Sequence, residues 1–415
     1  MYRFLEKLIP VDKAVEDATA CIRSISLRVH EVPVWDAVGL VSAEEVYAKI
    51  DQPEYDRSAV DGYAVIAEDT YGASPTNPVR LKLLGSMKPG DQPGKYTVRR
   101  GEAVEVSTGA PLPLGANAVV MAEDVGVSDT YIEVYRPVAF YANVSRKGED
   151  YRKGEILIGR KRVLKPWDLG IIASSGYSYI RVYERLRIGI FSTGSEIVEP
   201  GNPRRPGEIY NSTGVLVKAY LDGLRFVATR YYGVYPDDRR AVENILDKAL
   251  RDNHVVVVTG GAGVSKADVV RDVVSSSGEF VFRGIAIRPG RPTSLAVVDQ
   301  KPVFMLSGYP VAAWTALEAV VVPAIYRSLE LEPPVKPSVK AKLARRVPNT
   351  IGYRSFIRVS VWRKHGRYYA EPYMLRGSGV LSSLVRTNGY IVLDENSEGY
   401  EKGEEVTVYL HSSIV

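Results

Sequence analysis

The stretch that decides the fold is His254–Val274, HVVVVTGGAGVSKADVVRDVV. It begins with the valine run Val255–Val258, which is too short for a buried helix. Such β-branched runs are typical of a strand buried on both faces of a parallel sheet. A glycine-rich turn follows, and Asp268 then opens a segment with valines at helical spacing. The order of strand, glycine turn and helix predicts one unit of an α/β domain.

The glycine turn is a candidate anion site. Gly260, Gly261 and Gly263 let the backbone approach a ligand closely, and the unpaired N–H groups of the next helical turn point at whatever lies there. Ser265 belongs to the same turn, and Asp268 could instead orient a bound metal ion. No lysine of the Walker type follows. The residues alone leave open a second interpretation, a turn that binds nothing.

The composition is that of an ordinary soluble globular protein. Of 415 residues, 45% are hydrophobic and 25% are charged, and the formal net charge is +5. So small a charge argues only weakly for nucleic acid as a partner. No apolar run approaches the ~20 residues that span a membrane, and no basic and apolar leader precedes the chain. We therefore expect a cytoplasmic protein.

The cysteine and histidine content excludes several kinds of site. Cys21 is the only cysteine, which rules out an internal disulfide and a thiolate metal cluster. The histidines, at positions 30, 254, 365 and 411, show no metal-ligand spacing. Any metal ion should therefore be a hard cation held by carboxylates. His254 stands at the start of a buried strand, where we expect a structural role.

The N-terminal part of the chain shows two patterns of residue types. Residues 1–48 and 141–182 predict a helical and extended subdomain, with a short helix over 42–47. Residues 49–140 alternate strand-like runs, one of them at 96–98, with Gly/Pro turns. This alternation predicts an inserted β-rich subdomain.

The rest of the chain predicts an α/β domain followed by a β domain. Residues 183–329 alternate strands and helices, ending in a long helix over 311–329, which indicates a parallel sheet with helices on both faces. Prolines mark a stiff linker over 330–338. Residues 338–415 are rich in strands and predict a small β-barrel or sandwich. The expected fold class is thus multidomain, α/β plus β.

Carboxylates follow the predicted strands of the α/β domain. In open parallel sheets, ligands bind outside the carboxyl ends of the strands. Carboxylates that converge there, beside a glycine turn, suit Mg²⁺ held against a phosphate. The alternative is solvated loop charge. The loops at this edge are Thr193–Glu196, Pro236–Asp238, Thr259–Asp268 and Ser307–Pro310. The first three carry the four carboxylates Glu196, Asp237, Asp238 and Asp268.

A pair of arginines offers a second anion site. Arg288 and Arg291 flank a Pro-Gly turn, three residues apart. Their guanidinium groups suit an oxyanion, because each presents a planar fork of donors. The alternative is that both form surface ion pairs.

Seven sequence motifs, in this order, carry a resemblance to a known family: Asp56–Ala64, Ser107–Ala110, Gly148–Asp150, Phe191–Glu196, Gly207–Asn211, Thr259–Val264 and Ile287–Pro292. Over essentially its whole length the chain resembles the molybdopterin molybdenumtransferases. These are the MoeA-type enzymes, to which the C-terminal part of gephyrin also belongs.

The resemblance implies an L-shaped homodimer with four subdomains in each chain, the α/β one being MogA-like. It implies insertion of molybdate into adenylylated molybdopterin, with Mg²⁺-dependent cleavage that releases AMP. A molybdopterin adenylyltransferase would be the neighbouring enzyme. Neither nucleic acid nor a membrane is expected as a partner.

The resemblance also divides the expected site between the two chains. From one chain would come catalytic Asp56, Asp61 and Asp150 with substrate-binding Ser58 and Thr108. On the α/β side of the other would lie Glu196, Asp237 and Asp268, as catalytic residues and Mg²⁺ ligands. The substrate-binding residues expected there are Thr193, Gly194, Gly260, Gly261, Gly263, Ser265, Arg288, Arg291 and Pro310. The resemblance implies that the C-terminal barrel, like the insert, faces the α/β subdomain of the other chain, and the substrate-binding residues expected in the barrel are Arg354, Arg358 and Ser378.

One motif departs from the family. The family usually reads Pro-Gly-Asn-Pro-Val-Ser where this chain has Ser307-Gly308-Tyr309-Pro310-Val311-Ala312. A phenol replaces an amide beside the expected oxyanion site, so tungstate, as in a tungsten-related archaeal member, is an alternative to molybdate. Two other functions stay open: a molybdopterin adenylyltransferase, against which the additional β subdomains argue, and a non-catalytic gephyrin-like scaffold.

Overall fold

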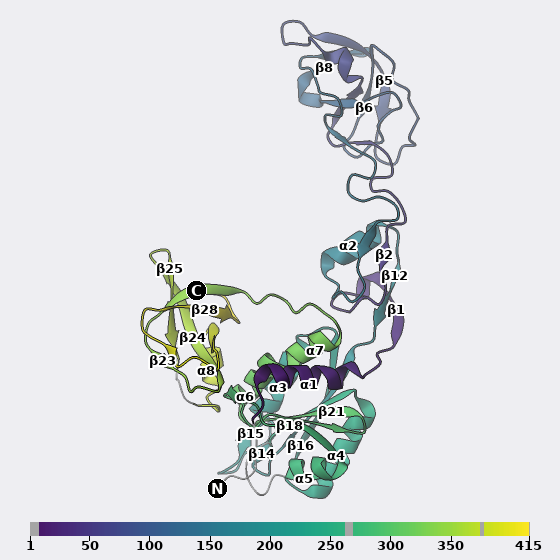
Figure 1. Ribbon diagram of the computed structural model, residues 1–415. Coiled ribbons are helices and arrows are strands. Elements are labelled where there is room, and N and C mark those ends of the chain that lie inside the picture. Colours follow the sequence, from purple (N-terminus) through teal and green to yellow (C-terminus); the bar gives the residue numbers. More distant parts are fainter. Residues whose placement is uncertain (1–7, 262–268, 374–376, 415) are drawn as a thin grey trace.

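The structure is a computed structural model that describes residues 8–261, 269–373 and 377–414. The molecule is elongated, with the β-rich insert at one end and the α/β unit at the other (Figure 1). A slender middle segment joins them, and the C-terminal barrel lies beside the α/β unit. Within the described residues, no helix is both long and apolar enough to cross a membrane.

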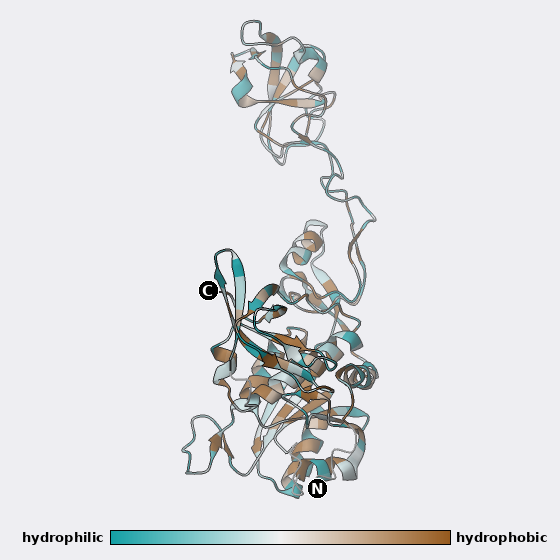
Figure 2. Cartoon of the chain, turned by 60° about the vertical axis from the view of Figure 1, so that its left-hand side comes forward, coloured by the Kyte–Doolittle hydropathy of each residue, from teal (hydrophilic) through white to brown (hydrophobic). Residues whose placement is uncertain are grey.

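A six-stranded sheet forms the centre of the α/β unit, in the order β16-β13-β17-β21-β20-β18. The first four strands are parallel, as predicted, whereas β20 and β18 run antiparallel and were not predicted. Every side chain of β17 is buried, and the central strands are coloured as hydrophobic in Figure 2. The strands are β13 Leu186–Thr193, β16 Val227–Tyr235, β17 Val255–Thr259, β18 Gly278–Arg283, β20 Ser294–Val298 and β21 Lys301–Leu306.

Helices cover both faces of this sheet. One face packs against α1 (Val11–Arg23), α3 (Ser212–Asp222), α6 (Pro310–Ala316) and α7 (Val322–Ser328). The other face packs against α4 (Arg239–Asp252) and α5 (Val269–Ser277). In α1, Val11, Ala14, Val15, Ala18 and Ile22 recur at helical spacing, and all five are buried against the α/β unit.

The long helix expected over 311–329 is interrupted. A π-helical turn, Leu317–Val321, separates α6 from α7. Pro323 lies just beyond this turn. Because proline has no N–H for the carbonyl four residues earlier, an unbroken α-helix is unfavourable here.

The middle segment is built from paired short strands and one helix. It contains β1 (Val29–Pro33) paired with β12 (Tyr179–Tyr183), β2 (Val46–Tyr47) paired with β11 (Ile156–Ile158), and α2 (Pro166–Ser174). The short helix predicted over 42–47 is wrong. The backbone N–H of Ser42 donates instead to the carbonyl of Arg162 at 2.9 Å, and Lys161 donates to the carbonyl of Ser42 at 2.8 Å. These long-range bonds outweigh the local preference for a helix.

The insert is a six-stranded sheet in the order β7-β4-β6-β5-β9-β8. The strand predicted over 96–98 is reduced to a single bridge between Thr97 and Leu114. The insert joins the middle segment at a neck, where β3 pairs with β10. The six strands of the sheet are β4 Gly62–Val65, β5 Val79–Met87, β6 Glu102–Val106, β7 Ala118–Met121, β8 Val125–Val127 and β9 Tyr131–Val134. The two neck strands are β3 Arg57–Ser58 and β10 Val144–Ser145.

The C-terminal part is a closed barrel, because β24 pairs with both β25 and β26. One short strand of the α/β unit, β19 (Ile287–Arg288), extends this barrel by pairing with β24. The barrel strands are β22 Ser338–Leu343, β24 Arg354–Lys364, β25 Arg367–Pro372, β26 Gly389–Leu393 and β28 Glu405–Leu410. Smaller elements are β14 Ile197–Val198, β15 Ile209–Tyr210, β23 Val347–Pro348, β27 Gly399–Tyr400, α8 Ser382–Val385 and the 3₁₀ turns Val34–Asp36, Ala67–Thr70 and Ala122–Asp124. The subdomain boundaries given above stay a prediction.

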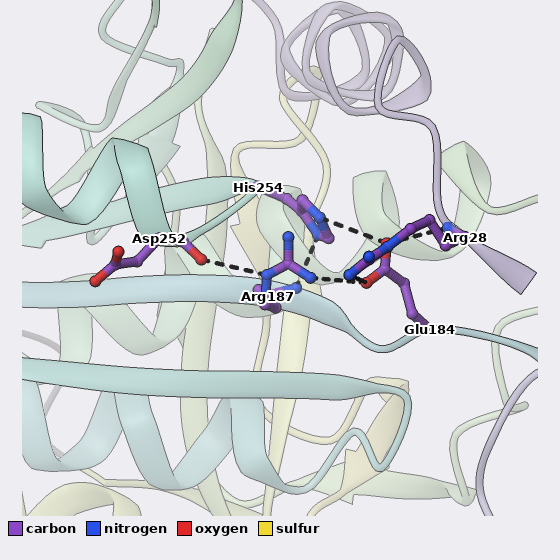
Figure 3. Close-up of polar contacts among 5 residues, drawn as sticks. All are labelled: Arg28, Glu184, Arg187, Asp252 and His254. Carbon is purple, nitrogen blue, oxygen red and sulfur yellow. Dashed lines mark hydrogen bonds and ion pairs between the residues drawn. The ribbon is translucent and has the colours of Figure 1, made fainter. Parts of the chain in front are cut away.

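A cluster of charges ties the middle segment to the α/β unit (Figure 3). Glu184 accepts from the backbone N–H of Arg28 at 3.0 Å and from Nη1 of Arg187 at 2.7 Å. Burial opposes the charge of Glu184, but these hydrogen bonds and charges outweigh it and lower its pKa to about 2. Nδ1 of His254 accepts from the backbone N–H of Arg187, and burial lowers the pKa of His254 to about 4. A neutral, hydrogen-bonded ring agrees with the structural role expected for His254.

Candidate functional site

The loops at the carboxyl edge of the parallel strands lie together, as predicted. The N–H of Gly194 donates to the carbonyl of Tyr235 at 3.2 Å, which joins the loops after β13 and β16. The N–H of Gly260 donates to the carbonyl of Leu306, also at 3.2 Å, which joins the ends of β17 and β21. Four separate pieces of sequence therefore form one surface at this edge.

The glycine turn after β17 passes too close to its neighbours for any side chain. Gly260 has φ +90°, and a Cβ on it would lie 2.1 Å from the carbonyl oxygen of Thr193. Gly261 has φ +59°, and its Cβ would lie 2.5 Å from the side chain of Val270. Both positions therefore need glycine. Gly263, Ser265 and Asp268, predicted for the same site, lie outside the described residues.

The hydroxyl of Thr193 faces this turn. Its Oγ1 is buried and has no hydrogen-bond partner among the residues that the structure describes. Such groups are rare in folded proteins, and each one calls for an explanation, of which a bound ligand is one. The hydroxyl is thus a candidate ligand contact beside the turn, in line with the role expected for Thr193.

Two of the predicted carboxylates share this edge. Asp237 donates its backbone N–H to Oγ of Ser195 at 3.4 Å. Burial raises the pKa of Asp237, and the charge of Glu196 raises it further, although a hydrogen bond from the backbone of Ser195 to the carboxylate opposes the shift. Asp238 has a structural part instead, because its Oδ1 caps α4 through the N–H of Ala241 at 2.8 Å.

Whether these carboxylates can hold Mg²⁺ depends on how many oxygen ligands the protein has to supply. In the described residues, no three His, Cys, Asp or Glu side chains converge on a common metal position. Mg²⁺ commonly uses one or two carboxylates and takes its other oxygens from water and substrate phosphates. Glu196 and Asp237 together meet that requirement.

A cleft of about 320 Å³ separates the α/β unit from the barrel. Arg288 lines it from the α/β side, where Nη1 donates to Oγ1 of Thr350 at 2.6 Å and the guanidinium lies 4.0 Å from the ring centre of Tyr353. Buried Arg358 lines it from β24, with Nε donating to Oγ of Ser383 at 3.2 Å. Two arginines therefore line one cleft, and guanidinium groups suit an oxyanion.

The loop Ser307–Pro310 connects the glycine turn to this cleft. A Cβ on Gly308 would lie 3.5 Å from Cα of Gly260, so the loop passes alongside the turn. The ring of Tyr309 lies against Gly379, where a Cβ would meet it at 3.1 Å. One residue into α6, the N–H of Val311 donates to the carbonyl of Ser378 at 3.0 Å. The turn and the cleft are therefore neighbouring parts of one site.

Arg291 and Arg354, which were also predicted to bind substrate, have different surroundings from Arg288 and Arg358. Arg291 is exposed on the turn after β19. Arg354 forms ion pairs with Asp12 at 2.8 Å and Glu395 at 2.9 Å, and so joins α1 to the barrel. The ion pairs give Arg354 a structural part, and a contact of Arg354 with substrate stays a prediction.

The residues predicted from the other segment gather at the insert and its neck. Oδ1 of Asp61 accepts from N and Oγ1 of Thr108 at 2.7 and 3.0 Å, and the backbone N–H of Thr108 is the main reason why the pKa of Asp61 is lowered. Oδ1 of Asp56 accepts from the N–H of Lys147 at 2.8 Å. Ser58 is buried in β3, and the N–H of Asp150 donates to the carbonyl of Gln52 at 3.0 Å.

Within one chain these two groups are not brought together. The insert and the α/β unit lie at opposite ends of the molecule in Figure 1.

The sequence analysis did not predict all residues of the cleft. Thr350 and Tyr353 hold Arg288 from the barrel, yet they belong to none of the motifs and come 62 residues or more after it.

Comparison with known proteins places this fold in one family. Residues 9–176 match the MoeA N-terminal region (domain I and II), residues 189–327 a probable molybdopterin binding domain, and residues 340–411 the MoeA C-terminal region (domain IV). A molybdopterin biosynthesis protein of Methanocaldococcus jannaschii is 36% identical over 419 residues, which cover 98% of this chain and 99% of the relative.

Two more relatives agree with this assignment. A molybdopterin molybdenumtransferase of Staphylococcus aureus is 28% identical over 410 residues, which cover 98% of this chain and 96% of the relative. A crystal structure of a molybdopterin biosynthesis MoeA protein from Pyrococcus horikoshii has a TM-score of 0.82 at 32% identity and covers 98% of this chain and 100% of that one.

The fold and the matched regions define a multidomain transferase of molybdenum cofactor biosynthesis. The chain belongs to the MoeA family. The resemblance drawn from the seven motifs is thereby confirmed for the family, the fold class and the class of enzyme.

Proposed function

We propose that the chain inserts molybdate or tungstate into adenylylated molybdopterin and releases AMP in a reaction that depends on Mg²⁺. The molybdopterin molybdenumtransferase of Staphylococcus aureus, matched along nearly its whole length, supports this reaction. A molybdopterin adenylyltransferase would supply the substrate. The cytoplasmic location expected from the sequence is part of the proposal.

The single observation that carries the proposal is the adjacency of the glycine turn and the arginine cleft. Gly308 packs beside Gly260, and Tyr309 reaches Gly379 at the cleft. A phosphate at the turn and an oxyanion in the cleft would therefore belong to one bound substrate. That arrangement suits a reaction in which a pyrophosphate is cleaved as an oxyanion is taken up.

The residues present fit that chemistry. Cleaving a phosphoanhydride depends more on positioning and on fixed charge than on a strong nucleophile. Arg288 and Arg358 would bind and orient the oxyanion. Glu196 and Asp237 would hold Mg²⁺, together with Asp268, which lies outside the described residues. When bound, Mg²⁺ neutralises charge on the phosphate oxygens.

We infer that the working form is a homodimer in which the insert of one copy completes the site of the other. Asp61 and Thr108 lie at the far end of the chain from the α/β loops, so a second copy would be needed to join the two groups. The middle segment exposes large aromatic side chains: Trp35 is 92% exposed, Trp167 67% and Tyr179 58%. Exposed apolar side chains gathered on one segment are typical of an interface between proteins.

The oxyanion itself depends on the surroundings of Tyr309. Its side chain is 62% exposed between the turn and the cleft. Molybdate and tungstate have the same charge and nearly the same size, so the contacts of this loop would decide between them.

The test is turnover of adenylylated molybdopterin with molybdate, with tungstate and with neither, each with and without Mg²⁺. We expect AMP release that needs Mg²⁺ and one of the two oxyanions. AMP release that is independent of both would contradict the proposal. Consumption of ATP with non-adenylylated molybdopterin would favour an adenylyltransferase instead.

A further inference from the structure

A buried carboxylate lies where the α/β unit meets the barrel. Glu318 belongs to the π-helical turn between α6 and α7 and is only 7% exposed. Its carboxylate accepts hydrogen bonds from Tyr220 of α3, from Lys336 of the proline-rich linker and from Tyr390 of β26. Three segments from three parts of the chain thus converge on one side chain.

The charge of Glu318 is stabilised in this place. Burial alone would favour the neutral acid, but the charge of Lys336 and the surrounding hydrogen bonds lower the pKa of Glu318. Nζ of Lys336 also donates to the hydroxyl of Tyr390 at 3.1 Å. Glu318 and its three partners therefore form an ionised hydrogen-bond network in which each buried side chain has a partner.

An aromatic cluster continues this network toward the cleft. The ring of Tyr390 lies 5.2 Å from that of Trp314 in α6 and 5.7 Å from that of Phe356 in β24. The carbonyl of Phe356 accepts from Nη1 of Arg358 at 3.1 Å. Trp314 follows Pro310, the first residue of α6, by one helical turn. The network is thus connected to both the site loop and the arginine of the barrel.

The strand pair β19–β24 also attaches the barrel to the α/β unit. It involves only two residue pairs, Ile287 with Arg354 and Arg288 with Ser355. The ion pair of Arg354 with Asp12 adds to it, but the side chain of Asp12 is 69% exposed. Glu318 provides a buried attachment at a separate place, which would limit rotation of the barrel about β19–β24.

We propose that Glu318 is a positioning residue, which fixes the barrel against the α/β unit and so sets the distance between the glycine turn at Gly260 and Arg358 of the barrel. The consequence for substrate binding rests on the proposed function, whereas the consequence for geometry does not. Loss of the network should leave the barrel attached through β19–β24 but allow it a wider range of orientations.

The test measures geometry first. Spin labels at Val215→Cys in α3, which is 53% exposed, and at Val385→Cys in α8, which is 80% exposed, report the distance between the two units. The natural Cys21 is replaced by serine in all samples. We expect a narrow distance distribution in the otherwise unchanged protein and one at least twofold broader in Glu318→Gln.

Two further variants control this measurement. Glu330→Gln also removes the partner of a lysine, Lys161, but at an exposed position, and should leave the distribution narrow. Tyr390→Phe removes one donor, keeps the aromatic stack and should broaden the distribution partly. If Glu318→Gln fails to fold, Tyr390→Phe takes its place in the distance measurement.

The second readout is calorimetric binding of adenylylated molybdopterin, which would have to reach from the glycine turn to the cleft. We expect Glu318→Gln to bind about 10-fold more weakly, because small displacements of a binding group have large effects. An unchanged distribution in both Glu318→Gln and Tyr390→Phe would overturn the proposal, and so would a broader distribution with unchanged affinity. If the unaltered protein does not bind adenylylated molybdopterin, the proposed function fails, and the distance distribution alone decides whether Glu318 fixes the barrel.

Discussion

A Cβ atom on Gly260 would lie 2.1 Å from the carbonyl oxygen of Thr193. The strands β17 and β13 therefore end so close together that the turn after β17 has no room for a side chain. This contact brings the glycine turn beside the buried hydroxyl of Thr193 and the carboxylate loop that follows it.

Gly260→Ala should strongly reduce activity. The alanine side chain would clash with the backbone of Thr193, and its positive φ is strained, so the turn would have to move. The backbone strain alone costs on the order of 1–3 kcal/mol. Thermal unfolding and AMP release measure the two effects. Gly170→Ala in α2, where a Cβ meets nothing within 4 Å, is the matched control and should keep full activity. Normal turnover in Gly260→Ala would separate the turn from catalysis.

Asp237→Asn should raise the Mg²⁺ concentration needed for half-maximal AMP release by about 10-fold or more, because it removes one charge from the proposed metal site. Burial raises the pKa of Asp237, so its carboxylate loses charge sooner than usual as the pH falls. We therefore expect the Mg²⁺ requirement of the unaltered enzyme to increase toward acid pH, and that of Asp237→Asn to depend less on pH. Titration of Mg²⁺ at several pH values checks both. An identical Mg²⁺ requirement in the two proteins would remove Asp237 from the site.

Mixing two inactive variants should restore activity if the site is shared. Asp61→Asn damages the insert side and Glu196→Gln the α/β side, so each homodimer has no intact site. A mixed dimer carries one intact site, and co-refolded mixtures should regain about a quarter of full activity. Sedimentation of the same samples gives the size of the active species. A stable monomer that is fully active would exclude the shared site.

Glu184 should make stability depend on acid pH. Its pKa of about 2 lies below the ordinary value of 4.5, so its ionised form stabilises the folded state. This contribution, about 3 kcal/mol at most, is complete above pH 4.5 and is lost as the pH falls toward about 2. Denaturant unfolding at pH 6, 4 and 3 measures it. Glu184→Gln should flatten this dependence, whereas exposed Glu16→Gln should not.

The parts of the fold that the sequence predicts are those that local pattern determines. The valine run of β17 and the glycines after it form a strand and a turn in any α/β domain, so the carboxyl edge of the sheet follows from them. The helix expected over 42–47 fails because Ser42 is bound to Arg162, which lies far along the chain. No local pattern contains that pairing.

The candidate site divides in the same way. Gly260 and Arg288 belong to sequence motifs, and both were predicted as site residues. Thr350 and Glu318 were not, because their importance comes from Arg288 and Tyr390, partners 62 and 72 residues away. Such contacts exist only after the barrel has closed against the α/β unit.

The most direct test of the central claim is a crystal structure with adenylylated molybdopterin bound. We predict the pyrophosphate beside Gly260 and Thr193, the pterin end toward the cleft of Arg288 and Arg358, and the insert of a second copy in contact with the ligand. A ligand bound away from the turn after β17, or held by one chain alone, would contradict the account.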